Sequence, residues 1–158
     1  MGTRESSRTK SPVQIAALVV GAVFLLVGIL GFVPGITTDY DLLGGAGHHS
    51  GAKLLGIFQV SVLHNLVHLI FGVAGIAFAR TVQTARLYLI VGGVVYLVLW
   101  IYGLVIDQAS AANFVPVNTA DNWLHFALGA GMVALGFFTA RIGSTPATDP
   151  TRPHSPMD

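Results

Sequence analysis

The chain has no cysteine and few charged residues, which make up 9% of its 158 positions. The lack of cysteine excludes disulfides, thiolate chemistry, iron–sulfur clusters and covalent c-type haem, so a metal or cofactor site must use histidine, aspartate or neutral donors. Soluble globular proteins contain about 25% charged residues. Here hydrophobic residues make up 53% and the mean hydropathy is +0.72. We therefore expect lipid to be the solvent of most of the surface.

Signals of several other protein classes are also missing. The net charge is +1 and no basic cluster alternates with aromatic residues, so no nucleic-acid partner is predicted. The sequence contains no Walker loop, no Rossmann glycine pattern, no HExxH and no nucleophile elbow, so nothing supports an enzyme and no catalytic residue is predicted. His48 and His49, with Asp39 and Asp121, lack the fixed spacing of a known metal site, so no metal site is predicted.

Four apolar stretches predict an all-α membrane protein with four transmembrane helices. The stretches cover residues 13–33, 54–79, 87–106 and 123–140. Each has about the 20 residues that a hydrocarbon core of roughly 30 Å requires. The first is too long for a signal peptide and lacks a cleavage site. The chain divides into an N-terminal tail (1–11), a transmembrane domain (12–141) and a tail rich in proline, serine and threonine (142–158), which we expect to be disordered.

Basic residues predict the orientation of the four spans, because lysine and arginine are retained on the cytoplasmic side of short loops. One predicted side carries Arg4, Arg8, Lys10, Arg80, Arg86, Arg141 and Arg152. Only Lys53 falls on the other side. We therefore place both termini in the cytoplasm. The acidic residues Asp39, Asp41, Asp107 and Asp121 then belong to external loops, where we expect them to be solvated.

Two blocks of the sequence occur twice in the same order. The block Phe32-Val33-Pro34-x-x-Thr37-x-Asp39 recurs as Phe114-Val115-Pro116-x-x-Thr119-x-Asp121, and Asn65-x-x-His68-x-x-x-Gly72 recurs as Asn122-x-x-His125-x-x-x-Gly129. A weaker echo relates Gly21-x-x-Phe24 and Gly31 to Gly93-x-x-Tyr96 and Gly103. The pattern predicts two duplicated helical hairpins related by a pseudo-twofold axis along the membrane normal. Chance matching in apolar sequence is the competing explanation.

Polar and small residues share one face of the second and fourth predicted helices. In lipid a polar side chain needs a partner and small residues let helices approach, so we expect this face to point into the bundle. The candidate intramembrane polar site is Asn65, His68, Asn122 and His125. The candidate helix-packing residues are Gly72, Gly75, Gly129 and Gly136. His64 lies off this face.

His68 and His125 have the most chemical potential, and three roles are open to them. They can form interhelical hydrogen bonds, ligate haem, or carry protons or small solutes. Counted from Arg80 and Arg141, the two imidazoles differ in depth by about one helical turn, which argues against haem. A proton path would lack the intramembrane carboxylate that most relays use. No cofactor is predicted, and haem stays as an alternative.

The segments HNLVH (64–68) and NFVPVNTADNWLH (113–125) are the most specific parts of a pattern that runs from Pro12 to Arg141. This pattern resembles a bacterial family of small four-helix membrane proteins of unknown function. The resemblance implies a multi-pass inner-membrane protein and carries no activity, ligand or catalytic residue.

Our leading hypothesis from the sequence is a non-enzymatic accessory or scaffold protein whose polar faces hold two hairpins together. The alternative is a b-type haem or quinone redox carrier that uses His68 and His125, and a second alternative is a transporter of protons or small solutes. The expected partners are the lipid bilayer and either another membrane protein or a second copy of the chain.

Overall fold

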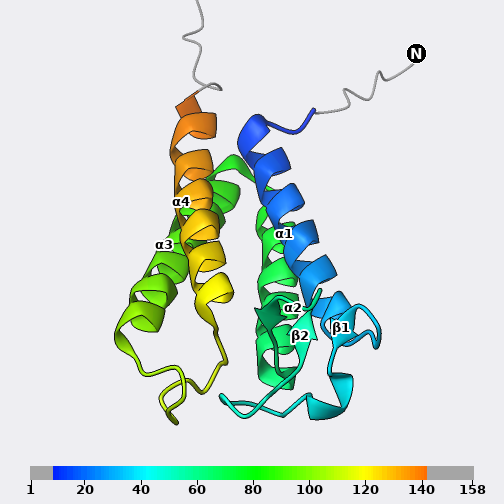
Figure 1. The fold of residues 1–158 in the computed structure, drawn as a ribbon. Helices are drawn as coiled ribbons and strands as arrows, with labels where there is room; N and C mark the ends of the chain where they lie inside the picture. Colours follow the sequence, from blue (N-terminus) through cyan, green and yellow to red (C-terminus); the bar gives the residue numbers. More distant parts are fainter. Residues whose placement is uncertain (1–8, 142–158) are drawn as a thin grey trace, which may run out of the picture.

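The computed structural model describes residues 9–141 and contains four helices with a small sheet at one end (Figure 1). The helices are α1 (Pro12–Leu30), α2 (Val62–Phe78), α3 (Val82–Val105) and α4 (Thr119–Arg141). They form two antiparallel pairs, α1 with α2 and α3 with α4, so the start of α1 and the end of α4 lie at the same end of the molecule (Figure 1). The predicted tails, apart from residues 9–11, lie outside the described residues.

Local capping sets where the helices begin. Ser11 and Gln14 form a capping box at the start of α1, with Pro12 at the first helical position. The Ser61 hydroxyl accepts a hydrogen bond from the His64 N–H at the start of α2. The Asn118 side-chain oxygen accepts one from the Asp121 N–H at the start of α4. Each cap satisfies a backbone donor that has no partner within its own helix.

The second apolar stretch, expected as one helix over 54–79, is divided in the structure. Its first residues belong to a three-stranded antiparallel sheet of β1 (Thr37–Thr38), β2 (Lys53–Leu54) and β3 (Phe58–Gln59), and α2 begins only at Val62. Leu55 and Gly56, both with positive φ, close the turn between β2 and β3. Hydropathy cannot separate a short apolar strand from a helix, so the predicted helix began too early in the sequence.

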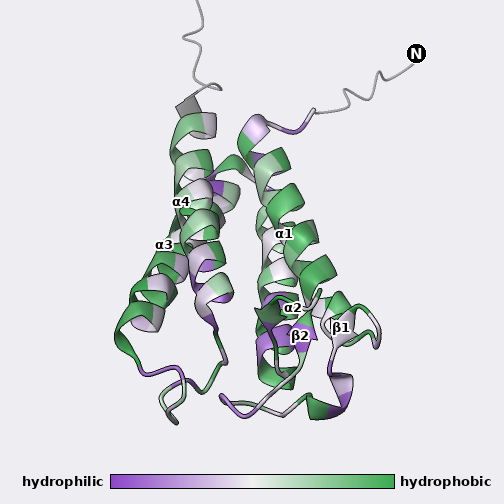
Figure 2. Ribbon diagram, in the orientation of Figure 1, coloured by the Kyte–Doolittle hydropathy of each residue, from purple (hydrophilic) through white to green (hydrophobic). Residues whose placement is uncertain are grey.

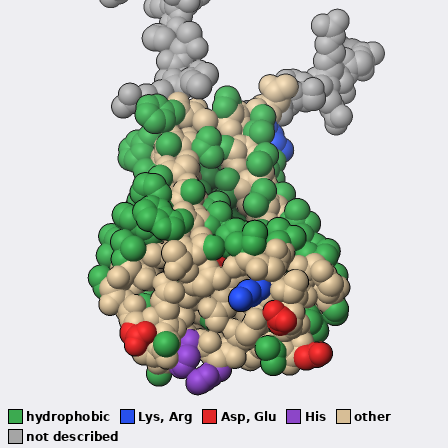
Figure 3. Space-filling view, viewed as in Figure 1, with side chains coloured by type: hydrophobic (Ala, Val, Ile, Leu, Met, Phe, Trp, Pro, Cys, Tyr) green, Lys and Arg blue, Asp and Glu red, His purple; other side chains and the backbone are tan. Residues whose placement is uncertain are grey.

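Polar and apolar side chains are distributed as in a protein surrounded by lipid. Large apolar residues such as Val19, Ile70 and Val98 are exposed on the outer faces of the helices, which are mostly hydrophobic (Figures 2 and 3). The acidic and histidine side chains visible in Figure 3 gather at the end that carries the sheet, whereas basic side chains are visible at both ends. The helices α1, α3 and α4 are long and apolar enough to cross a membrane, while α2 is a shorter apolar helix of 17 residues.

The end of the bundle away from the sheet is filled by small and apolar residues. Val13, Ala17, Ala85, Leu89 and Met132 are buried there in one cluster. The Gln14 side chain also donates hydrogen bonds to the carbonyls of Ala79 and Arg80, which ties α1 to the end of α2. The buried polar groups of the helices therefore lie toward the sheet end, where α2 and α4 begin.

Candidate functional site

All four residues of the candidate polar site are buried, at 1% to 6% exposure. His68 and His125 stand at the same distance from the caps of their helices, Ser61 and Asn118. The expected difference in depth of one turn, which was counted from Arg80 and Arg141, stays a prediction. Both imidazoles lie in the second turn of a helix, near the sheet.

The two asparagines occupy matching positions against glycines of the neighbouring helix. A Cβ atom added to Gly31 would lie 2.1 Å from the Asn65 Oδ1 atom, and one added to Gly103 would lie 2.3 Å from the Asn122 Oδ1 atom. A side chain at either place would overlap the amide unless the asparagine moved. Neither Oδ1 atom has a hydrogen-bond partner among the described residues, and the Asn65 Nδ2 atom also has none.

The four candidate packing glycines are buried between helices. A Cβ atom added to Gly72 would lie 2.8 Å from the Gly21 carbonyl oxygen, and one added to Gly129 would lie 2.9 Å from the Gly93 carbonyl oxygen. A Cβ atom added to Gly75 would lie 2.7 Å from the Gly21 Cα atom. A Cβ atom added to Gly136 would lie 2.7 Å from an Ile90 side-chain atom. Gly72, Gly75 and Gly129 thus lie where backbone approaches backbone.

Two further polar residues of the site were missed by the sequence analysis. His64 is 5% exposed, and Asp121, which was expected in a solvated external loop, is 2% exposed within the first turn of α4. The expectation for Asp121 was wrong because the α4 helix starts before Trp123. A signal was present in the sequence, since His64 precedes Asn65 just as Asp121 precedes Asn122.

His64 and Asp121 connect the two helix pairs by reciprocal hydrogen bonds. The His64 Nδ1–H donates to the Pro116 carbonyl oxygen, just before α4, with 3.2 Å between the atoms. The Asp121 Oδ2 atom accepts from the Gln59 N–H, just before α2, at 2.9 Å. In each case a residue in the first turn of one helix reaches the backbone that leads into the other.

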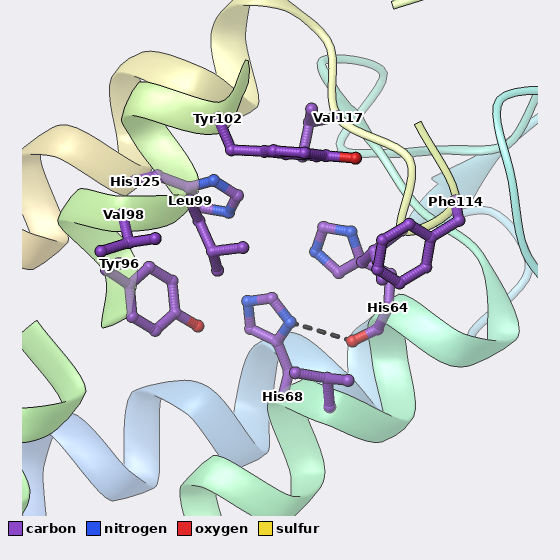
Figure 4. A pocket seen from close by; sticks show the side chains of 11 residues that line it. His64, His68, Tyr96, Val98, Leu99, Tyr102, Phe114, Val117 and His125 are labelled. Carbon is purple, nitrogen blue, oxygen red and sulfur yellow. Dashed lines mark hydrogen bonds between the residues drawn. The ribbon is translucent and has the colours of Figure 1, made fainter. Parts of the chain in front are cut away.

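The three buried histidines surround a cavity of about 230 Å³ (Figure 4). His64 and His68 contribute from α2, Tyr96 from α3 and His125 from α4. The His64 and His68 rings are stacked with centroids 4.5 Å apart, and the His125 ring meets Tyr96 edge-on at 5.3 Å. Exposed apolar residues, Val98 and Phe114, also line this space, so it opens to the surface between apolar side chains.

The hydrogen bonds of His64 and His68 determine which ring nitrogen is free. The His68 Nδ1–H donates to the His64 carbonyl oxygen at 3.0 Å. A carbonyl oxygen can only accept, so in both neutral rings Nδ1 carries the hydrogen and Nε2 carries a lone pair. His68 presents this second nitrogen to the centre of the cavity (Figure 4). The mostly apolar cavity therefore contains free hydrogen-bond acceptors, the Nε2 atoms of two of its histidines.

A second, smaller cavity of about 100 Å³ touches the same three histidines. Its other polar lining residue is Asp121. Val27, Phe58, Val60 and Leu124 supply much of its apolar wall.

The donor set does not form a metal centre in the described part of the chain, where no group of three or more histidine, aspartate or glutamate residues is placed to hold a metal ion. The larger cavity is also smaller than the pockets of about 300–1,000 Å³ that hold drug-sized molecules. A porphyrin is larger than this cavity, so the cavity does not fit haem as it stands.

These features define a helical protein with apolar helices of membrane type and a cavity lined by three buried histidines. The chain belongs to the family described as a domain of unknown function, DUF4383, whose sequence model matches residues 14–138. No curated protein and no solved structure matches the chain.

Proposed function

We propose that all four helices cross the bilayer, with both termini in the cytoplasm. The exposed apolar faces support this, and 17 residues of α2 extend about 26 Å, close to the roughly 30 Å of a hydrocarbon core. Lys10, Arg80 and Arg86 belong to the end that carries the termini. Arg4, Arg8 and Arg152 lie outside the described residues. Asp41 and Asp107 belong to the loops of the opposite end, which is external in this orientation.

We also propose that α1–α2 and α3–α4 are copies of one hairpin. One spacing along the sequence relates His64 to Asp121, Asn65 to Asn122 and His68 to His125, and a second relates Phe24 to Tyr96. Equivalent residues make equivalent contacts: Phe24 meets His68 edge-on at 5.6 Å, and Tyr96 meets His125 edge-on at 5.3 Å. Phe24 and Tyr96 stack on each other at 5.2 Å, as expected for a pair on the axis. These matching contacts support duplication as the explanation of the repeated blocks.

The function that best fits the site is binding of a small phenol or quinol ring taken from the outer half of the bilayer. The observation that carries this proposal is the pair of Nε2 lone pairs on His64 and His68, beside a cavity of about 230 Å³. A quinol donates through its O–H groups to such acceptors, whereas a quinone offers only carbonyl acceptors. The lipid-facing lining at Val98 and Phe114 gives an apolar molecule a route into the cavity.

The other hypotheses account for less of the site. A scaffold needs no cavity, and the described hydrogen bonds between the hairpins, such as those of His64 and Asp121, do not use the His68 Nε2 atom, which is therefore available to a ligand. A transporter needs a polar route to the cytoplasmic end, where the buried cluster is built from residues such as Ala17, Leu89 and Met132. Binding without transport or chemistry is the simplest activity that uses the cavity.

The test compares a hydroquinone that carries a short alkyl tail with the corresponding quinone. Both are titrated into detergent-purified protein by calorimetry. Dithionite is added only to the quinol titration, because it would reduce the quinone; the chain has no cysteine and so no disulfide for the reductant to break. We expect the quinol to bind at least about tenfold more tightly than the quinone, the equivalent of one hydrogen bond to a buried acceptor. Equal affinity for both forms would refute the proposal.

Replacing His68 by phenylalanine sharpens this test, because the substitution keeps an aromatic ring and removes the Nε2 lone pair. We expect it to weaken quinol binding by about tenfold. The matched control is His49→Phe, which changes an exposed histidine in the external loop. Retained quinol affinity in His68→Phe would show that the imidazole is not the acceptor.

A further inference from the structure

The smaller cavity is the counterpart of the larger one under the exchange of the two hairpins. His64, Val67 and His68 line the larger cavity, and Asp121, Leu124 and His125 line the smaller one. The walls also correspond, with Val115 and Val117 matched by Phe58 and Val60, and Leu99 matched by Val27. The main change in chemistry is that a carboxylate stands in one copy where an imidazole stands in the other.

Asp121 has one oxygen engaged and one available. Its Oδ2 atom accepts hydrogen bonds from the Gln59 and Asn118 backbone N–H groups, each at 2.9 Å. Its Oδ1 atom accepts no hydrogen bond from the described residues, and none of their lysine or arginine side chains lines the cavity. A carboxylate that is 2% exposed and has no positive partner is costly in a membrane, so such residues pair with a cation where one can reach them.

We propose that the smaller cavity is a binding site for a small primary ammonium ion of the size of ammonium or methylammonium. Its volume of about 100 Å³ corresponds to about three water molecules at roughly 30 Å³ each. Such a cation donates N–H bonds to the Asp121 Oδ1 atom and to imidazole nitrogen, and the Phe58 ring supplies a π face. This site shares His64, His68 and His125 with the proposed quinol site, but Asp121 and most of its apolar wall line only the smaller cavity, and the proposal does not depend on quinol binding.

The donor set separates an ammonium ion from other cations. Alkali and alkaline-earth ions prefer several oxygen ligands, whereas this cavity offers one free carboxylate oxygen beside three imidazoles. Imidazole nitrogen accepts an N–H bond readily. Quaternary ammonium ions have no N–H to donate, and tetramethylammonium is larger than methylammonium. Selectivity for cations that carry N–H bonds is therefore the signature of the site.

The experiment measures the thermal unfolding midpoint of the full chain in detergent against increasing concentrations of four chloride salts at constant ionic strength. Ammonium and methylammonium should raise the midpoint with saturation, and potassium and tetramethylammonium should not. Asp121→Asn should raise the half-saturating ammonium concentration by about tenfold or more. Asparagine keeps an oxygen for the Gln59 and Asn118 N–H groups, so the cap of α4 is retained. The control Asp41→Asn removes an equal charge from an exposed external position and should have no effect.

A pair of cavity-filling variants, which leave Asp121 unchanged, tests whether the ammonium ion binds in the smaller cavity. Val27→Phe narrows the smaller cavity and should abolish the ammonium effect while quinol binding remains. Leu99→Phe narrows the larger cavity and should do the reverse. Equal effects of all four salts, or an ammonium response that survives both Asp121→Asn and Val27→Phe, would overturn the proposal. Loss of quinol binding alone would refute only the proposed function.

Discussion

Replacing Gly93 by alanine tests whether direct backbone contact holds α3 against α4. An added Cβ atom would lie 2.8 Å from the Gly129 carbonyl oxygen and 2.9 Å from the Val133 backbone nitrogen. Both are backbone atoms, so the helices must move apart. The neighbouring Gly92 differs, because its Cβ atom would meet the flexible end of the Met132 side chain at 2.7 Å. A Cβ atom on Gly131 would meet nothing within 4 Å.

The expected magnitudes follow from two opposing contributions to the free energy of unfolding. Alanine is better than glycine in a helix interior by about 0.8–1.0 kcal/mol, and overpacking a dense interior costs about 1–3 kcal/mol. Gly93→Ala should therefore lower the free energy of unfolding by up to about 2 kcal/mol, and Gly131→Ala should raise it by up to about 1 kcal/mol. The free energy of unfolding of Gly92→Ala should lie between those of the other two variants, because the flexible Met132 side chain can move away from the added methyl group.

Unfolding by SDS in mixed micelles, followed by far-ultraviolet circular dichroism, measures all three variants on one scale. The difference between Gly93→Ala and Gly131→Ala is the most reliable quantity, because the helix-propensity gain is common to both. We expect it to be about 1–3 kcal/mol. If Gly93→Ala proves as stable as Gly131→Ala, the helices do not meet at this glycine and the close seam is wrong.

Three further predictions follow from the same structure. Reporter fusions after Gly143 should be active only as cytoplasmic reporters and fusions within residues 48–52 only as external ones; the opposite activity at either place would remove the four-span topology. Asn65→Leu should unfold no more easily than the unmodified protein in the SDS assay, because both side-chain polar atoms of Asn65 are buried without a partner, which costs about 1–3 kcal/mol; a clear loss of stability would indicate a hydrogen bond to a bound molecule. Protein purified after growth with excess haem precursor should show no Soret absorption, because the cavity is too small for a porphyrin, and a stoichiometric Soret band would contradict that.

The sequence alone determined the apolar helices, since hydrophobicity is a property of consecutive residues and needs no knowledge of distant neighbours. It also predicted which helix faces carry small and polar residues, because helical periodicity places Asn65, His68 and Gly72 in one row. The repeated blocks pointed to a duplicated hairpin, which remains a proposal. By contrast, the sequence left His64 without a role and placed Asp121 in a solvated loop.

Tertiary structure decided the site because burial depends on segments far apart in the chain. The β2–β3 hairpin occupies residues that hydropathy gave to a helix, and it brings the Gln59 backbone to Asp121. The tautomer of His64 depends on the Pro116 carbonyl, 52 positions away in the sequence. The larger cavity lies where α2, α3 and α4 meet, and the smaller one lies where α1, α2, α4 and the β2–β3 hairpin meet. Neither their sizes nor the lone pairs that face them therefore follow from residue order. Local patterns fix what a segment can form, and only packing fixes which polar atoms remain unpaired.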